Sequence, residues 1–405
     1  MTSLLPAPLR SRSSRSAADH RQGTSAADRG ATLFLDGLRG LAALAIVGYH
    51  AFLFTGLDNQ TTQGLPAAAH VFLLGQLAVA MFIVLSGFVL SAPAIRRGGV
   101  LPRGTADYLR RRARRILPPY YAAIGVSLAL IAAFPVLQHR SGSAWDSKIP
   151  VTPAGILSHV LLIQDVMPQW IFQADGPLWS IAVEWQLYFF LPFALLPLRR
   201  MWGTVPTVLS AGLAGPLLAI AVPGSQIAHP WLLGCFALGM LAADMVYGGA
   251  GFRFHPLLTR CARPAVLVPA TVASVAAFAA VAPKLSNALV VADTVTAALV
   301  AAWIVALVTG ASPLVRRVKR ILESRALLTI GMFSYSIYLV HAPVLALLNL
   351  ESLHWQLPLA GRLALMVAVA APLAVGVGYV FHRLVERRFL TSHQRSVSTA
   401  DASPR

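Results

Sequence analysis

The stretch LDGLRGLAALAIVGYH, residues 35–50, holds an arginine and a histidine within one apolar helix. It belongs to an apolar run at 33–57 that is long enough to cross the ~30 Å core of a bilayer. Arg39 and His50 should lie on nearly the same helix face, about 16 Å apart along the axis, and Asp36 is predicted to pair with Arg39. An ionisable residue at membrane depth usually faces a cavity or the bundle interior. The stretch therefore marks a candidate site, although an arginine reaching back to the membrane surface and a histidine packed between helices would fit the same pattern.

The composition assigns most of the chain to a membrane. Of its 405 residues, 57% are hydrophobic and only 12% are charged, whereas soluble domains carry about 25% charged residues. Nine more apolar runs of spanning length follow the first, at 67–91, 116–137, 177–198, 204–222, 229–247, 264–282, 287–309, 327–349 and 361–385. We therefore predict an all-α polytopic membrane protein with about ten transmembrane helices. Residues 33–390 form its membrane domain, 1–32 a disordered basic tail and 391–405 a polar tail.

Loop charge predicts the orientation. With ten spans and a cytoplasmic N-terminus, 29 of the 33 Lys and Arg residues lie in or beside cytoplasmic segments, and only Arg140, Lys148, Lys284 and Arg362 lie outside. This is the positive-inside pattern. Both termini are therefore expected in the cytoplasm, and the protein is expected to be a multi-pass protein of the cell membrane. The apolar segment 153–165 is too short to span and is expected to be re-entrant or interfacial.

The net charge of +18 does not indicate a nucleic-acid partner, because the cations occupy short segments between apolar runs. Two cysteines, Cys235 and Cys261, are too few for a disulfide framework or a metal cluster, and no metal is expected. The lipid bilayer is the partner that the composition does indicate.

A cluster of arginines precedes the third span in YLRRRARRILPPYY, residues 108–121. Guanidinium groups suit phosphate oxygens. Either Arg112 with Arg115 or Arg111 with Arg114 could face one ligand, since each pair is three residues apart on a helix. The same arginines would serve equally well as an anchor for anionic lipids.

Later spans carry isolated ionisable residues. Glu184 lies within the apolar stretch GPLWSIAVEWQLYFFLP, residues 176–192, where a carboxylate needs a partner. His341 lies in the outer half of the ninth predicted span. His382 and Glu386 follow at the end of the tenth, where Glu386 is expected to form a surface ion pair with neighbouring arginines.

Taken in order, these segments resemble the membrane-bound acyltransferase-3 family, which are O-acyltransferases of sugars, polysaccharides and glycosylated natural products. The family has an Arg and a His at the spacing of Arg39 and His50, and its Arg-x-x-Arg before I-x-P selects Arg112 and Arg115. Three further family segments are similar to MFIVLSGFVLS at 81–91, LWSIAVEWQLYFFLP at 178–192 and SYSIYLVHAPVL at 334–345. The resemblance covers about 33–390.

Three positions depart from the family pattern. Trp185 stands where many members have a second glutamate, Ala80 where many have an aspartate, and Arg388 where the family has the proline of an E-R-P ending. These departures put secondary roles in doubt.

The resemblance implies an acyl-CoA donor, with acetyl the usual acyl group. It would bind from the cytoplasm with its phosphates on Arg112 and Arg115, and with Arg39 as a further contact. The acceptor would be a carbohydrate or a glycosylated metabolite.

The resemblance also implies His50 as the general base on the acceptor hydroxyl, since imidazole titrates near neutral pH. Glu184 would either orient that imidazole or pair with an arginine, and His341 would line the acceptor path. Direct transfer is favoured over an acyl-enzyme on Ser86 or Ser180, because the chain has no G-x-S-x-G pattern.

A transporter of a glycan or an amphipathic metabolite is the alternative function, because Arg, His and Glu within spans also occur along substrate paths. Against it, the hydropathy shows no two-fold repetition and no pair of broken spans at matching positions.

Overall fold

The computed structural model describes residues 32–55, 64–65, 67–249, 260–281 and 288–390. Within these ranges the chain forms helices and connecting turns and no strand, which agrees with the all-α prediction. Apart from Thr32, the predicted tails lie outside the described residues, so the cytoplasmic placement of both termini stays a prediction.

Nine helical segments of the described chain are long and apolar enough to cross a membrane. They contain α2 (Phe34–Phe54), η1 (Ala67–Leu77) with α4 (Ala78–Ile95), α5 (Gly104–Ala133), α7 (Trp179–Phe190) with α8 (Leu196–Trp202), α9 (Thr204–Ala221), α10 (Leu232–Tyr247), α13 (Leu289–Thr309), α16 (Ser334–Ser352), and α17 (Leu359–Leu365) with α18 (Ala371–Leu384). The seventh predicted span is the shorter α12 (Pro264–Ala280), whose 17 residues reach the lower limit for a span. The polytopic all-α fold is therefore confirmed.

The arginine-rich segment before the third span is helical. The span was predicted to begin at residue 116, but α5 begins at Gly104, because arginine and alanine favour helix and continue the apolar helix that follows. The arginines are thus fixed on one rigid element. The segment 153–165 contains α6 (Pro153–Val160), whose eight residues are too few to span.

The ninth predicted span, 327–349, is divided into α15 (Arg325–Met332) and α16. Helix α15 packs tightly against α2. A Cβ atom at Gly40 would overlap the backbone of α15, and one at Gly331 would overlap the backbone of α2. Small residues permit such close helix approach in membranes.

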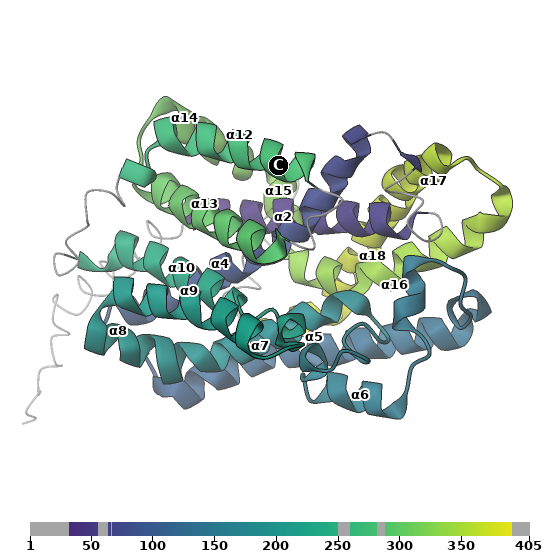
Figure 1. Ribbon diagram of the computed structural model, residues 1–405, viewed down its shortest axis with the longest axis horizontal. Coiled ribbons are helices and arrows are strands. Elements are labelled where there is room, and N and C mark those ends of the chain that lie inside the picture. Colours follow the sequence, from purple (N-terminus) through teal and green to yellow (C-terminus); the bar gives the residue numbers. More distant parts are fainter. Residues whose placement is uncertain (1–31, 56–63, 66, 250–259, 282–287, 391–405) are drawn as a thin grey trace, which may run out of the picture.

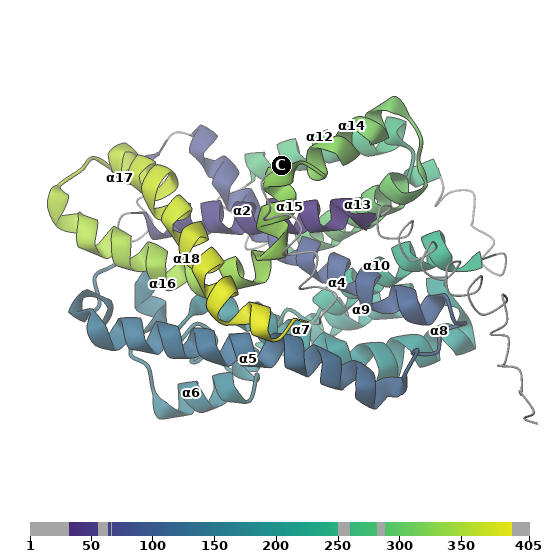
Figure 2. The same ribbon diagram turned by 180° about the vertical axis from the view of Figure 1, so that it is seen from behind.

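Helix α2 lies at the centre of the bundle, where it contacts α4, α15, α16 and α18. Most of the long helices run along the long axis of the molecule, with α8 near one end and α17 toward the other (Figure 1). Helix α18 crosses α16 on the opposite side (Figure 2). Because α2 is surrounded in this way, the face that carries Arg39 and His50 is enclosed by helices.

Candidate functional site

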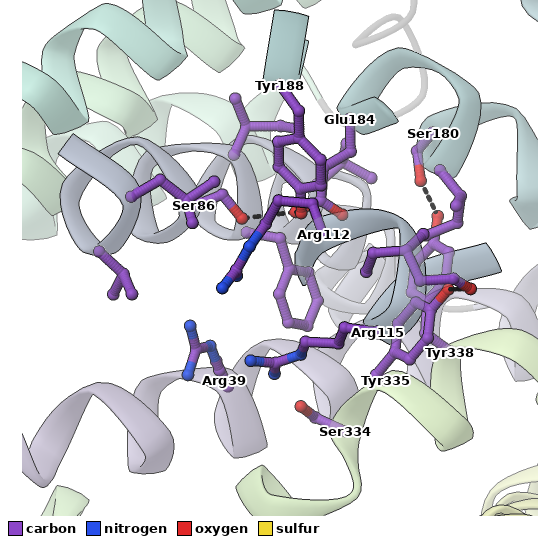
Figure 3. A pocket seen from close by; sticks show the side chains of 17 residues that line it. Arg39, Ser86, Arg112, Arg115, Ser180, Glu184, Tyr188, Ser334, Tyr335 and Tyr338 are labelled. Carbon is purple, nitrogen blue, oxygen red and sulfur yellow. Dashed lines mark hydrogen bonds between the residues drawn. The ribbon is translucent and has the colours of Figure 1, made fainter. Parts of the chain in front are cut away.

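Three arginines converge on one cavity of about 90 Å³, which we call the arginine cavity. Arg39 comes from α2, and Arg112 and Arg115 come from α5. Their guanidinium groups point into a common space in Figure 3. The cavity is also lined by Ser86, Ser180, Glu184, Tyr188, Ser334, Tyr335, Tyr338 and nearby apolar side chains. Three like charges at one place repel one another unless an anion lies among them.

The rest of the arginine cluster faces elsewhere. Arg110 and Arg111 both form ion pairs with Asp107 in the first turn of α5. Within the described chain no carboxylate lies within ion-pair distance of Arg112, and its buried Nε atom has no hydrogen-bond partner. The structure therefore leaves Arg112 free to bind an anionic ligand.

The predicted pair of Asp36 and Arg39 is confirmed, with 2.9 Å between Arg39 Nη1 and Asp36 Oδ1. The side chain of Asp36 is about half exposed, whereas that of Arg39 is 21% exposed. The pair holds the Arg39 guanidinium at the mouth of the arginine cavity and leaves its other nitrogen atoms available to a ligand.

Glu184 lies in the arginine cavity and is held by two hydroxyl groups. Ser86 Oγ donates to Glu184 Oε1 at 2.5 Å, and Tyr188 Oη donates to the same oxygen at 2.6 Å (Figure 3). Ser86 comes from α4, so the contact joins two spans. Glu184 makes no hydrogen bond with His50, which lines a different cavity.

His50 instead pairs with His341 of α16, with 3.0 Å between His50 Nδ1 and His341 Nε2. His341 Nδ1 lies 3.0 Å from the Ile337 carbonyl oxygen and 2.8 Å from that of Tyr338. Carbonyl oxygens only accept, so His341 Nδ1 carries the hydrogen and its Nε2 is an acceptor in the neutral ring. His50 Nδ1 also lies 3.0 Å from the Ile46 carbonyl oxygen, so it too carries a hydrogen, which it shares between that oxygen and His341 Nε2. His50 Nε2 is left with a free lone pair.

His50 lines a second cavity of about 410 Å³, which we call the histidine cavity. Its polar and aromatic lining includes Tyr49, His50, Gln76, Ser143, Ser147, Lys148, Trp179, His229, Asp293 and Tyr338. The free His50 nitrogen is therefore offered to a ligand in a chamber that has both hydrogen-bonding groups and aromatic faces.

Two residues, Val79 and Tyr338, line both cavities and form the wall that they share. The Tyr338 hydroxyl is fixed by a 2.9 Å hydrogen bond to the carbonyl oxygen of Pro177 and by a 2.5 Å contact with Ser180 Oγ. The arginines and the histidine pair thus face two chambers that meet at one tyrosine.

Lys148, which lies between α5 and α6 and outside the spans, is only 7% exposed. Burial lowers its pKa to about 8, an effect that Asp175 and Asp146 partly oppose. Burial likewise raises the pKa of Asp175 to about 7. A lysine that loses its charge near pH 8 therefore lines the same cavity as His50.

The expected surface ion pair at Glu386 is wrong. Glu386 is 2% exposed, and its Oε2 atom lies 2.8 Å from His382 Nδ1 and accepts from Ser336 Oγ at 2.6 Å. The last turns of the chain fold back against α16, so the carboxyl group is buried there instead of facing the neighbouring arginines. This cluster joins the two helices away from both cavities.

The predicted site residues fall into two groups. One group shares the arginine cavity, namely Arg39, Arg112, Arg115 and Glu184, and the other pairs at the histidine cavity, namely His50 and His341.

Sequence reasoning missed Lys148, Asp293 and Tyr338. A lone lysine in an outer loop and a lone aspartate in an apolar span were the available signals for two of them.

Comparisons with known proteins show which sequences this chain is similar to. A family model described as Acyltransferase domain matches residues 32–383. The chain is 28% identical over 403 residues to Acyltransferase MdmB of Streptomyces mycarofaciens, covering 90% of this chain and 94% of that protein. It is 41% identical over 163 residues to Protein 2 in picA locus of Rhizobium radiobacter, covering 38% of this chain and 75% of that protein. It is 26% identical over 237 residues to Peptidoglycan O-acetyltransferase OatA of Listeria monocytogenes, covering 56% of this chain and 33% of that protein. No solved structure gives a significant match.

Proposed function

The chain belongs to the acyltransferase-3 family of acyl-transferring enzymes, and we propose that it moves an acyl group from acyl-CoA to a hydroxyl of a carbohydrate or a glycosylated metabolite. An acetyl group is the simplest donor group. The family match leaves the transporter alternative without support, since transporters do not transfer acyl groups.

The donor is assigned to the arginine cavity. Arg112 and Arg115 have no carboxylate partner in the described chain, and bidentate guanidinium groups suit phosphate oxygens. The volume of about 90 Å³ suits a phosphate group but not a nucleotide. The nucleotide would therefore lie at the cytoplasmic surface, on the side where the loops carry most of the Lys and Arg residues.

The acceptor is assigned to the histidine cavity. Relatives of this chain include a protein named as a peptidoglycan O-acetyltransferase, which supports a glycan or glycoside acceptor. The cavity of about 410 Å³ has room for a sugar ring, and it offers hydrogen-bonding side chains together with aromatic faces.

His50 acts as the general base in the proposed reaction. Its Nε2 atom takes the proton of the acceptor hydroxyl, the oxygen attacks the thioester carbonyl carbon, the C–S bond breaks, and the departing thiolate receives the proton. Base catalysis of this kind contributes about 10²–10⁴-fold. His341 acts as a positioning residue, because it holds the orientation of His50, whose tautomer the Ile46 carbonyl oxygen also favours.

Direct transfer is the route that the side-chain contacts support. Ser86 donates to Glu184, and Ser180 contacts Tyr338. Neither hydroxyl contacts a histidine that could activate it as a nucleophile. Glu184 therefore serves the arginine cavity, where it positions Ser86 and offsets part of the positive charge.

One observation carries the proposal: a cavity built for an anion and a cavity that contains a free imidazole nitrogen share the wall formed by Val79 and Tyr338. A thioester reaching that wall from one side would meet a hydroxyl held on the other. Reacting groups held in this way gain the rate advantage of proximity.

The test is acyl transfer from radiolabelled acetyl-CoA by the purified protein in detergent, with a panel of glycosides. His50→Ala should lose at least a hundredfold in kcat, because it removes the base. The matched control is His354→Ala, an exposed histidine near the end of α16, which should retain the wild-type rate. Equal turnover by His50→Ala and the wild type would refute the assigned base, and no CoA-dependent turnover by any form would refute the assigned donor.

A further inference from the structure

Asp293 is a buried acidic residue that the proposed reaction does not use. It lies in α13, is 4% exposed and lines the histidine cavity. Its Oδ2 atom accepts a 2.9 Å hydrogen bond from Trp231 Nε1. Its buried Oδ1 atom has no hydrogen-bond partner in the described chain. Buried polar atoms are nearly always hydrogen-bonded, so an unpaired one in a cavity indicates a ligand group.

An aromatic stack lines the same cavity. The rings of Trp179 and His229 lie parallel, with 4.0 Å between their centroids and 19° between their planes. His229 also contacts Trp231, the residue that holds Asp293. The backbone of His229 has a φ of 50°, a left-handed conformation that residues other than glycine seldom adopt. Backbone strain of this kind gathers at functional sites, where it fixes a side chain in place.

We propose that Asp293 and the Trp179–His229 stack form the recognition site for the acceptor, in which a hydroxyl on its sugar ring bonds to Asp293 Oδ1 and the ring lies against the aromatic stack. This inference rests on the proposed function, because it takes the histidine cavity as the acceptor chamber. A hydroxyl other than the reacting one makes this contact, and the reacting hydroxyl faces His50. Asp293 is thus a specificity residue that selects the position to be acylated.

A hydroxyl fits this site better than a cationic group. A hydroxyl both donates and accepts, so it satisfies Oδ1 whether the carboxyl group of Asp293 is ionised or protonated. An ammonium group would satisfy only the ionised form. Lys148 lines the same cavity and would repel a second cation.

The test is a comparison of Asp293→Leu, which removes both side-chain oxygens, with the wild type by steady-state kinetics on the full-length protein in detergent. A panel of alkyl glycosides that differ in single hydroxyl groups serves as the acceptor, and acetyl-CoA hydrolysis without acceptor is measured in parallel. Asp293→Leu should lower kcat/KM for the preferred glycoside about tenfold, the usual range for one buried hydrogen bond. The loss should be smaller for the glycoside that lacks the bonded hydroxyl. KM for acetyl-CoA and hydrolysis without acceptor should not change.

Two further variants keep the test decisive. Trp179→Ala should raise the acceptor KM, and Trp179→Phe should restore most of it, because phenylalanine keeps an aromatic face for stacking. Thr294→Ala, at an exposed neighbour on α13, is the control and should match the wild type. If Asp293→Leu and Trp179→Ala leave the acceptor KM unchanged while His50→Ala still abolishes transfer, the recognition site is refuted and the proposed function stands. If the wild type hydrolyses acetyl-CoA but acylates no glycoside of the panel, the acceptor class itself is refuted.

Discussion

His341 offers the sharpest test of the proposed mechanism, because it contacts the base without lining either cavity. Its Nε2 atom accepts the hydrogen of His50 Nδ1, and its own Nδ1 is held by two backbone carbonyl oxygens. Two replacements separate its possible roles. His341→Gln keeps an acceptor atom near the position of Nε2, whereas His341→Asn is too short to reach His50.

The magnitude follows from the change in this hydrogen bond during the reaction. A hydrogen bond between neutral groups contributes about 1 kcal/mol, and one to a charged group about 1.5–3 kcal/mol. When His50 takes the proton, its hydrogen bond to His341 changes from a bond between neutral groups to a bond from a charged group. The difference is about 0.5–2 kcal/mol, which corresponds to a factor of about 2–30 in kcat. His341 is fully buried, so solvent does not screen this gain.

His341→Asn should therefore lower kcat about 2–30-fold, and His341→Gln should lower it clearly less than His341→Asn does. KM for acetyl-CoA should not change in either variant, because the arginine cavity does not include His341. Labelled transfer is measured at saturating acceptor, with thermal unfolding in detergent as a check of folding. Equal losses in both variants would mean that His341 acts by packing. A well-folded His341→Asn with the wild-type kcat would refute the assigned role of the pair.

Three other predictions test separate parts of the molecule. Arg112→Met should raise KM for acetyl-CoA about tenfold or more, since a charge-assisted contact to phosphate is lost. This KM should also depend less on salt concentration than in the wild type. Unchanged donor kinetics would refute the assigned donor site. Lys148 loses its charge as the pH rises through about 8, and that charge opposes proton uptake by His50 in the same cavity. The activity of the wild type should therefore rise across this pH. The rise should be absent from the pH profile of Lys148→Met, and a rise that persists in this variant would refute the assignment to Lys148. Glu386→Gln should lower the free energy of unfolding by about 1–3 kcal/mol, because the buried carboxyl group holds Ser336 and His382. The melting temperature in detergent should fall, while kcat per folded molecule should not change. A loss of kcat without a loss of stability would contradict this structural role.

Much of the fold could be predicted from the sequence, because the hydrocarbon core imposes a length and a composition on every span. The same holds for contacts within one helix. The pair of Asp36 and Arg39 follows from helical spacing. Spacing also allowed a shared face for Arg112 and Arg115, but it allowed one equally for Arg111 and Arg114, and the family resemblance made the choice. The helix break between α15 and α16 could not be predicted, since hydropathy continues across it.

Contacts between distant spans were beyond the reach of periodicity. His50 and His341 are 291 positions apart, and no local pattern states which of several intramembrane residues meets which. Glu184 was predicted to contact either His50 or an arginine, but its carboxylate bonds instead to Ser86 of α4. Lys148 was counted as an outer loop charge, although the loop folds inward and buries it.

The chain of hydrogen bonds behind His50 ends on backbone carbonyl groups and not on a carboxylate. In the proposed reaction the protonated His50 is therefore stabilised only by neutral partners, more weakly than beside an ion. An alkyl thiolate is basic enough to take the proton back as it departs. The nearest carboxylate of the predicted set, Glu184, lies instead among the arginines, where it offsets cationic charge without holding the proton on His50. Separating the carboxylate from the imidazole thus favours return of the proton to the leaving group, and this explains why a histidine pair can serve where a carboxylate partner was expected.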